Sequence, residues 1–232
     1  MKYLEREIEK GFDKFLQPNK VLVLMGARRV GKTELLKKRL SETKEPYLLL
    51  NGEDATTVSV LSNRSVENYK RLLGDKKLLV IDEAQTVPEI GKILKLMVDE
   101  INGIKIIATG SSVFDLENEL GEPLTGRDIT VRLFPLSQME FNKQENLIET
   151  KGRLEERLIL GSYPELQQYS GWDDKVKYLE RLISSYLIRD ILAFEKLKKP
   201  EKIISLLRLI AFQIGGEVSL PELGQKLGID KN

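Results

Sequence analysis

Short apolar runs alternate with amphipathic segments through the first part of the chain. In the amphipathic segments, leucine, isoleucine and valine recur every three or four residues, as they do on the buried face of a helix. The apolar runs have the length of strands and resemble strands buried on both faces of a parallel sheet. We therefore expect an α/β fold, with a five-stranded parallel sheet flanked by helices and joined by right-handed crossovers. The predicted strands span residues 21–25, 46–51, 78–82, 104–110 and 129–136.

The hydrophobic pattern changes on both sides of this predicted sheet. Before it, apolar residues at helical spacing predict an amphipathic helix over residues 3–15. After residue 136 the strand-like runs stop, and the remaining segments have helical period, which predicts an all-α appendage. We accordingly divide the chain into three parts, at 1–136, 137–199 and 200–232.

The last stretch has the pattern of the first half of a helix-turn-helix. Ser219 is followed three residues later by Glu222, which makes a capping box, and Leu223 and Leu227 supply one apolar face. The second helix of the motif would begin where the sequence stops, at Asn232. We therefore expect a truncated helix-turn-helix and interpret the chain as an N-terminal piece of a longer protein.

Composition narrows the possible chemistry, because the 232 residues include no cysteine and no histidine. Thiolate catalysis, disulfides and metal sites built on cysteine or histidine are excluded, and a general base has to be a carboxylate, lysine or tyrosine. The 37 Lys and Arg balance 36 Asp and Glu, which argues against a uniformly basic, nucleic-acid-binding surface. No apolar run approaches the roughly 20 residues that span a bilayer, and the N-terminus has no apolar stretch of a secretory signal. We therefore expect a cytoplasmic protein without a membrane segment.

The sequence GARRVGKT lies between the first predicted strand and a helical segment, which is the setting of a phosphate-binding loop. Its glycines let backbone N–H groups turn toward phosphates, and the N-terminus of the helix adds its dipole. Lys32 is expected to reach the β- and γ-phosphates, and the Thr33 hydroxyl to ligate Mg²⁺. The predicted nucleotide contacts are Gly26, Ala27, Arg28, Arg29, Val30, Gly31, Lys32, Thr33 and Glu34.

Two carboxylates, Asp82 and Glu83, end the third predicted strand. In nucleotide hydrolases with such a loop, the strand-terminal aspartate organises Mg²⁺ and the next carboxylate polarises the attacking water. We expect these roles for Asp82, together with Thr33, and for Glu83. The alternative interpretation is an acidic strand end that caps the following helix.

Polar residues also end the fourth predicted strand and precede the fifth. Thr109 and Ser111 are both candidates to contact the γ-phosphate or the attacking water, and the sequence does not decide between them. Arg127 is a candidate arginine finger, which would reach the nucleotide of a neighbouring subunit in a ring-forming ATPase. A solvated surface arginine is the alternative interpretation.

Several motifs together resemble those of the prokaryotic AAA-superfamily ATPases related to the archaeal ATPase and STAND groups. They are GARRVGKTELL, LLVIDEAQTVPEIGKILKLMVDE, IIATGSSVFDL, LTGRDITVRLFPLSQMEF, LGSYPEL and YLIRDIL. The resemblance implies a P-loop ATPase core at 1–136, a helical lid at 137–199 and a partial winged helix at 200–232. The GSYPEL segment matches a lid motif, and its alternative is a simple turn between helices.

Motifs and resemblance together lead to two functional hypotheses. The first is an ATPase that needs Mg²⁺ and couples ATP hydrolysis to movement of the appended helical domains, as a homo-oligomer if Arg127 acts across subunits. The second is a nucleotide-gated regulator with slow turnover, which binds a partner protein or, through the truncated helix-turn-helix, DNA. Whether the paired arginines, Arg28 and Arg29, do more than mark the family is left open by the sequence.

Overall fold

The computed structural model describes residues 3–111, 124–187 and 200–228. The chain divides into two compact units, Met1–Lys175 and Val176–Asn232. No helix in the described ranges is long and apolar enough to cross a membrane.

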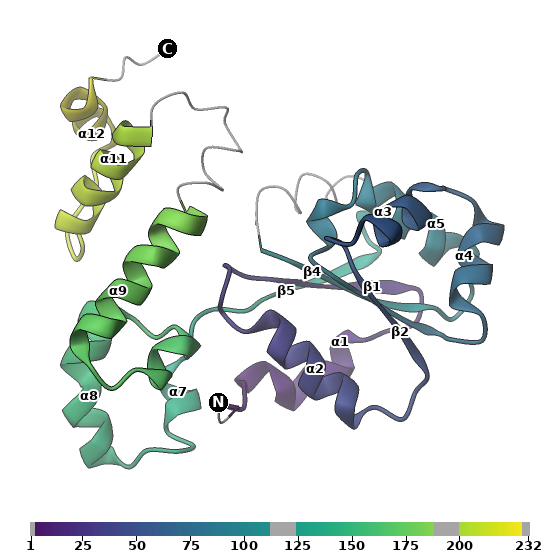
Figure 1. Cartoon of the computed structure of the whole chain (residues 1–232), viewed down its shortest axis with the longest axis horizontal. Coiled ribbons are helices and arrows are strands. Elements are labelled where there is room, and N and C mark those ends of the chain that lie inside the picture. The colour runs from purple at the N-terminus through teal and green to yellow at the C-terminus, as the bar shows by residue number, and fades with distance from the viewer. Residues whose placement is uncertain (1–2, 112–123, 188–199, 229–232) are drawn as a thin grey trace. The chain divides into compact units, whose positions relative to one another are not determined.

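Five strands form one parallel sheet within the described part of the first unit, in the order β2-β3-β4-β1-β5 (Figure 1). The central strand β1 pairs with β4 and β5, and Met25 at its end lies opposite Gly110 and Arg132. Because all the strands run in one direction, their carboxyl ends meet at the same edge of the sheet, where β1 enters the glycine loop. The predicted α/β fold with a five-stranded parallel sheet is confirmed. The strands are β1 Lys20–Met25, β2 Tyr47–Asn51, β3 Leu78–Asp82, β4 Lys105–Gly110 and β5 Asp128–Arg132.

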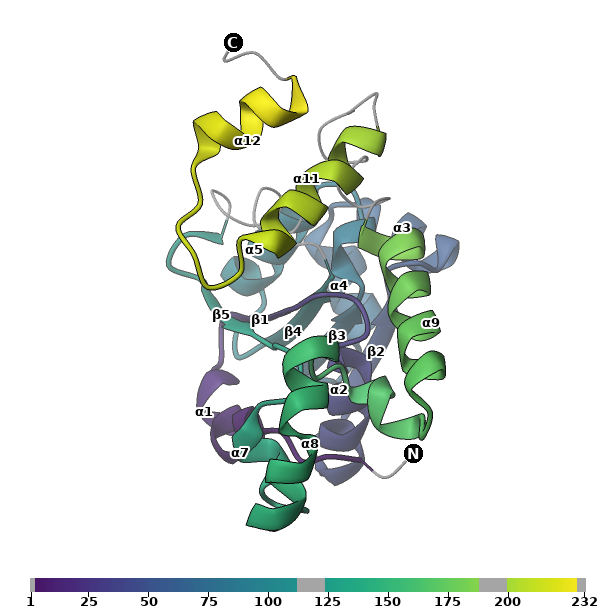
Figure 2. The same ribbon diagram turned by 90° about the vertical axis from the view of Figure 1, so that its left-hand side faces the viewer.

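Helices cover both faces of this sheet, with α1 and α2 on one face and α3, α4 and α5 on the other (Figures 1 and 2). Successive side chains of a strand point to opposite faces, so each strand contributes to two cores. In β1, Leu22 and Leu24 pack with α1 and α2, whereas Val21 and Val23 belong to the core on the other face. The helices are α1 Phe12–Phe15, α2 Lys32–Glu42, α3 Ala55–Ser62, α4 Val66–Leu73 and α5 Ile90–Glu100.

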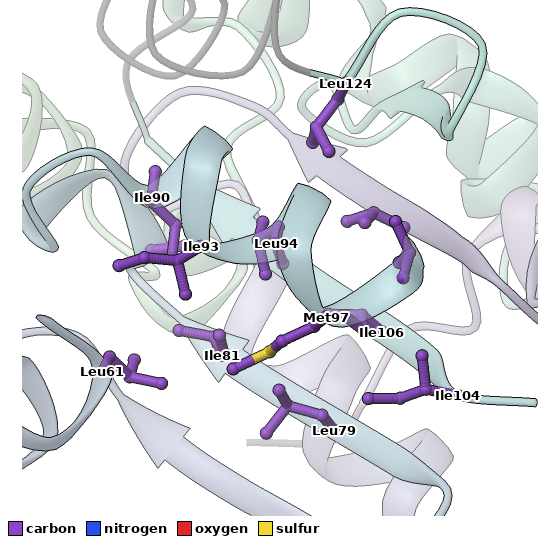
Figure 3. Close-up of a cluster of buried hydrophobic side chains, with 14 of the residues drawn as sticks. Leu61, Leu79, Ile81, Ile90, Ile93, Leu94, Met97, Ile104, Ile106 and Leu124 are labelled. Atoms are coloured by element: carbon purple, nitrogen blue, oxygen red, sulfur yellow. The ribbon is translucent and has the colours of Figure 1, made fainter. Parts of the chain in front are cut away.

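The core beneath α5 explains why the strands read as nearly continuous apolar runs. Leu94 and Met97 of α5 lie over Ile81 of β3 and Ile106 of β4, and all four are fully buried (Figure 3). A strand covered in this way on both faces has no solvated side, so the period-two alternation of an exposed sheet is lost.

Two segments of the first unit differ from the sequence prediction. The expected helix over residues 3–15 begins only with a 3₁₀ turn, η1 Glu7–Gly11, and continues as α1, because Arg6 is extended and Gly11 is a poor helix former. Strand β5 ends at Arg132 rather than at residue 136. Pro135 has no N–H to donate, and the chain turns away after Leu133 donates its N–H to Met25 O (2.7 Å).

After the sheet, the described residues form helices and turns, as predicted. In the first unit these are α7 Gln138–Phe141, α8 Leu147–Leu160 and the 3₁₀ helix η3 Pro164–Gln168, and α9 Trp172–Leu182 crosses into the second unit. The second unit continues with a π-helical turn, η4 Ile183–Leu187, and with α11 Pro200–Phe212 and α12 Leu220–Leu227, which contact each other. Ser219 caps α12 by accepting the Glu222 N–H (3.4 Å). The end of the expected helix-turn-helix, at residues 229–232, lies outside the described residues.

Candidate functional site

The predicted phosphate loop forms a tight turn between β1 and α2. Gly26 N–H donates to Gly110 O of β4 (3.3 Å), and Gly31 is the N-cap of α2 with φ of +99°. A Cβ atom on Gly26 would lie 2.3 Å from Leu133 O, far inside van der Waals contact. Both positions therefore require glycine, one for its freedom at positive φ and the other for close backbone approach.

Lys32 is buried at the start of α2, with its amine folded back over the loop. Its residue surface is only 5% exposed, and Nζ donates to Gly26 O (2.9 Å) and Ala27 O (3.2 Å). Burial lowers the pKa of Lys32, and the carboxylates of Glu83 and Asp82 offset part of that effect. The result is an incompletely solvated cation beside the loop, which suits an anionic ligand.

Thr33 and Asp82 meet where α2 begins and β3 ends. The Thr33 hydroxyl donates to Asp82 Oδ2 (2.9 Å), so two hard oxygen donors lie together close to Lys32. Oxygen ligands of this kind are the ones that Mg²⁺ prefers, and Mg²⁺ commonly takes few protein ligands together with phosphates and water. The donor set therefore fits a magnesium ion bound with a nucleotide.

Thr109 links the two carboxylate residues. Its hydroxyl donates to Asp82 Oδ1 and accepts the Glu83 backbone N–H (3.0 Å), and the residue is fully buried. Glu83 has left-handed backbone angles (φ 52°, ψ 45°), which are unfavourable for a non-glycine residue. Its carbonyl accepts from Thr86 Oγ1 (2.8 Å), so hydrogen bonds at both its N–H and its C=O hold this conformation.

The Glu83 side chain is held by two neutral donors. Gln85 Nε2 donates to Glu83 Oε2 (2.7 Å), and Ser111 Oγ donates to the same oxygen (3.2 Å). Gln85 Nε2 also contacts Ser111 Oγ (3.1 Å), which closes a small network. Ser111 thus lies beside the expected catalytic carboxylate, whereas Thr109 lies between the backbone of Glu83 and the side chain of Asp82.

Gln85 is a residue that the sequence analysis missed. It follows Glu83 by two residues in the quoted DEAQ stretch, and the 3₁₀ helix η2 Ala84–Thr86 turns its amide back toward the carboxylate. Its Oε1 atom is buried and has no hydrogen-bond partner among the described residues. Only the left-handed turn at Glu83, which no sequence pattern marks, brings this amide to the site.

Two of the predicted site residues lie apart from this cluster. Arg127 precedes β5, at the amino end of the sheet, and its Nε pairs with Asp99 Oδ1 of α5 (2.6 Å). A role of Arg127 toward a neighbouring copy stays a prediction. Glu34 is exposed on α2 and pairs with Lys37 (2.9 Å) on the helix surface.

The two arginines of the loop differ in their surroundings. Arg28 is half-buried. Burial is the main cause that lowers the pKa of Lys32, and the positive charge of Arg28 lowers that pKa further. Arg29 is exposed, has φ of 67°, and its Nη1 lies 3.8 Å from Glu165 Oε2 of η3. An exposed ion pair at this distance contributes little stability. The Arg29–Glu165 pair does, however, join the phosphate loop to η3.

The segment that Arg29 meets is GSYPEL, for which the sequence suggested a lid motif or a simple turn. Its Ser162 carbonyl accepts the Leu136 N–H (2.8 Å), and Tyr163 packs against the core formed by β1 and α2. Pro164 Cγ lies 4.0 Å from the place of a Cβ on Gly31. The segment therefore packs directly on the phosphate loop.

Comparisons with known proteins agree with this arrangement. A family model described as an AAA domain matches residues 18–142, and one described as a domain of unknown function (DUF8612) matches residues 151–232. The chain is 27% identical to an uncharacterized protein of Methanocaldococcus jannaschii, over 97% of this chain and 53% of that protein. It is 25% identical to an uncharacterized protein of Haemophilus influenzae, over 97% of this chain and 58% of that protein. A Mycobacterium bovis relative is 27% identical over 74% of this chain and 36% of its own length.

The chain thus spans about half the length of the Methanocaldococcus jannaschii and Haemophilus influenzae relatives. The AAA match begins just before β1 and ends after α7. It contains the phosphate loop, the carboxylate pair and the polar residues around that pair. Because this match covers more than half of the 232 residues, the chain belongs to the AAA domain family of P-loop proteins.

Proposed function

We propose that the chain binds ATP and hydrolyses it in a reaction that requires Mg²⁺. The observation that carries the proposal is the convergence of three groups at the carboxyl edge of the sheet. They are the buried amine of Lys32, the hydroxyl–carboxylate pair of Thr33 and Asp82, and the carboxylate of Glu83. The preference for ATP over GTP rests on the family resemblance and on the lack of the Asn-Lys-x-Asp signature of GTPases. The nearest match, FNKQEN at 141–146, lacks the aspartate and falls after the last strand.

In this proposal, the phosphate loop binds the triphosphate through backbone N–H groups and Lys32. The Lys32 amine at present satisfies loop carbonyls, and phosphate oxygens would take over part of that role. Thr33 and Asp82 would hold the magnesium ion, which supplies positive charge to the β- and γ-phosphates when bound.

Glu83 would orient a water molecule and accept its proton as the water oxygen attacks the γ-phosphorus. The bond between the γ-phosphorus and the bridging oxygen breaks, and ADP leaves with the electron pair of that bond. Gln85 and Ser111 would fix the direction of the Glu83 carboxylate through their hydrogen bonds to Oε2, which leaves Oε1 to face the water. Thr109 would act as a positioning residue, because its hydroxyl holds both the side chain of Asp82 and the backbone of Glu83.

Phosphate release from ATP, measured with and without Mg²⁺, tests this function. Glu83→Gln should keep ATP affinity and lose at least about a hundredfold in turnover, because the base is gone while the loop is intact. Glu89→Gln is a matched control, since Glu89 is an exposed carboxylate paired with Arg64 (3.0 Å), outside the network around Glu83. Failure of the wild-type chain to bind ATP, or equal turnover in wild type and Glu83→Gln, would contradict the proposal.

The appended helices suggest what hydrolysis drives. We propose that residues 137–199 act as a lid and that 200–232 form the start of a winged helix, in a piece of a longer protein. The contact of the GSYPEL segment with the phosphate loop supports a coupling of nucleotide state to the lid. A homo-oligomer in which Arg127 serves a neighbouring site belongs to the same proposal. Its test is whether turnover per chain rises with protein concentration in the wild type and ceases to do so in Arg127→Ala.

A nucleotide-gated regulator is the second candidate, favoured by the capped helix α12 and its contact with α11. In such a protein slow hydrolysis would time the binding of DNA or of a partner protein. DNA binding that is sensitive to salt and differs between ATP and ADP would support it. Affinity for DNA that is the same in both nucleotide states would remove it.

A further inference from the structure

Arg6 is a buried arginine that the proposed reaction does not use. It lies before η1, outside the residues that match the AAA domain, and only 4% of its surface is exposed. Burying a guanidinium is costly unless its hydrogen bonds and its charge are matched, so the partners of Arg6 determine whether its burial is tolerated.

The guanidinium joins three segments that are distant in the sequence. Nε donates to Glu140 Oε1 of α7 (2.9 Å), Nη1 donates to Val30 O of the phosphate loop (2.7 Å), and Nη2 donates to Phe134 O after β5 (2.5 Å). Glu140 is equally buried and also accepts the backbone N–H of Ser137 (2.7 Å). The Arg6–Glu140 pair therefore carries no net charge, and each of the three guanidinium nitrogens has an acceptor.

The contact with Val30 determines the orientation of one peptide group in the loop. In a planar trans peptide, the C=O of one residue and the N–H of the next point in opposite directions. Because Arg6 holds the Val30 carbonyl, the N–H of Gly31 points away from Arg6. Gly31 is the N-cap of α2 at positive φ, a residue without a Cβ whose backbone turns easily unless something restrains it.

We propose that Arg6 is a positioning residue for nucleotide binding. By holding the Val30 carbonyl on the outer side of the phosphate loop, it keeps the Gly31 N–H directed at the phosphates. In this role Arg6 acts without touching the nucleotide, because it is buried and each of its three guanidinium nitrogens already donates to Val30, Phe134 or Glu140. The inference rests on the proposed nucleotide-binding function and adds to it a residue outside the matched domain.

The test compares Arg6→Lys and Arg6→Met with Arg157→Met in the same chain. Arg157 is a matched control because its side chain is also buried and paired, with Nη2 2.5 Å from Glu145 Oε1. Its partners in the described part of the chain are Glu145, Gln138 and Phe141, which lie outside the loop. We measure the dissociation constant for ATP, the KM and kcat of hydrolysis, and the urea midpoint. The ¹⁵N amide resonance of Gly31 is recorded without nucleotide.

The Arg6 variants should bind ATP about tenfold more weakly or worse, with KM changed more than kcat, because an unsatisfied loop carbonyl lets the peptide turn. Their Gly31 resonance should shift or broaden. Arg157→Met should lower the urea midpoint and leave ATP affinity and the Gly31 resonance unchanged. If Arg6→Met does not fold, Arg6→Lys decides, since it keeps the charge but its single ammonium nitrogen cannot reach the three acceptors that three guanidinium nitrogens bond in the wild type.

Wild-type affinity for ATP in the Arg6 variants, or equal losses in the Arg6 and Arg157 variants, would overturn the inference. A wild-type chain that does not bind ATP would instead defeat the proposed function. In that case the Gly31 resonance still decides whether Arg6 orders the loop, and an unchanged resonance in both Arg6 variants would refute it.

Discussion

Replacing Thr109 by valine isolates the hydrogen bonds that hold the carboxylate pair. Valine has nearly the shape of threonine, but it removes the hydroxyl that donates to Asp82 Oδ1 and accepts the Glu83 N–H (3.0 Å). The position is fully buried, so no water can take the place of the hydroxyl without disturbing the packing. The variant therefore leaves the Glu83 N–H without an acceptor and Asp82 with one donor fewer.

The expected loss follows from these two contacts. A buried backbone donor left unsatisfied costs about 1 to 3 kcal/mol, and a hydrogen bond to a carboxylate contributes a similar amount. Asp82 keeps its bond from Thr33, which limits the second loss. We expect Thr109→Val to lower the free energy of unfolding by about 2 to 4 kcal/mol. Thr109→Ser keeps the hydroxyl and loses one buried methyl group, at a cost of about 1 kcal/mol.

Urea denaturation and phosphate release are the assays. Turnover of Thr109→Val should fall more than ATP affinity, because the displaced residues are Asp82 and Glu83 rather than the phosphate loop. Thr109→Ser should keep most of the activity. Equal unfolding free energies for the two variants would refute the reasoning that the hydroxyl holds the pair. Normal stability of Thr109→Val with lost turnover would instead assign the hydroxyl to contact with the nucleotide or the water.

Two further predictions concern buried charges. Lys32→Met should weaken ATP binding by about a hundredfold, since the charge-assisted hydrogen bonds to phosphate are lost. The same substitution should leave the urea midpoint unchanged or higher. Burial lowers the pKa of the Lys32 amine, which means that the folded state disfavours its positive charge. Equilibrium binding of a fluorescent ATP analogue and urea denaturation measure both, and a marked loss of stability would contradict the argument. For Glu140, burial alone raises the pKa, but hydrogen bonds from Ser137, Glu7 and Arg6 outweigh it, so the folded-state pKa lies below the ordinary 4.5. The stability from this carboxylate is therefore complete above pH 4.5 and is lost as the pH falls below it, and Glu140→Gln should flatten that part of an acid titration of the urea midpoint.

Local sequence patterns determined the architecture and the glycine loop. The strands β1, β3 and β4 are covered on both faces and therefore have to be apolar almost throughout, which gave a clear signal. The loop needs glycine at Gly31, where φ is positive, and at Gly26, where the backbone approaches Leu133. Asp82 was predictable for a related reason. In a parallel sheet, a polar residue at a strand's carboxyl end lies at the same edge as the loop, whatever the rest of the fold does.

Tertiary structure alone decided which side chains complete the site. Thr109 and Ser111 looked equivalent in the sequence, but the register of β3 and β4 brings Thr109 to Asp82, whereas Ser111 meets the side chain of Glu83. In the sequence, Arg6 is one of several charged residues in an amphipathic segment. In the structure, its hydrogen-bond partners come from segments up to 134 positions away. Such contacts depend on how the elements pack, and periodicity, propensity and short motifs carry no information about which distant backbone carbonyl a buried arginine will meet.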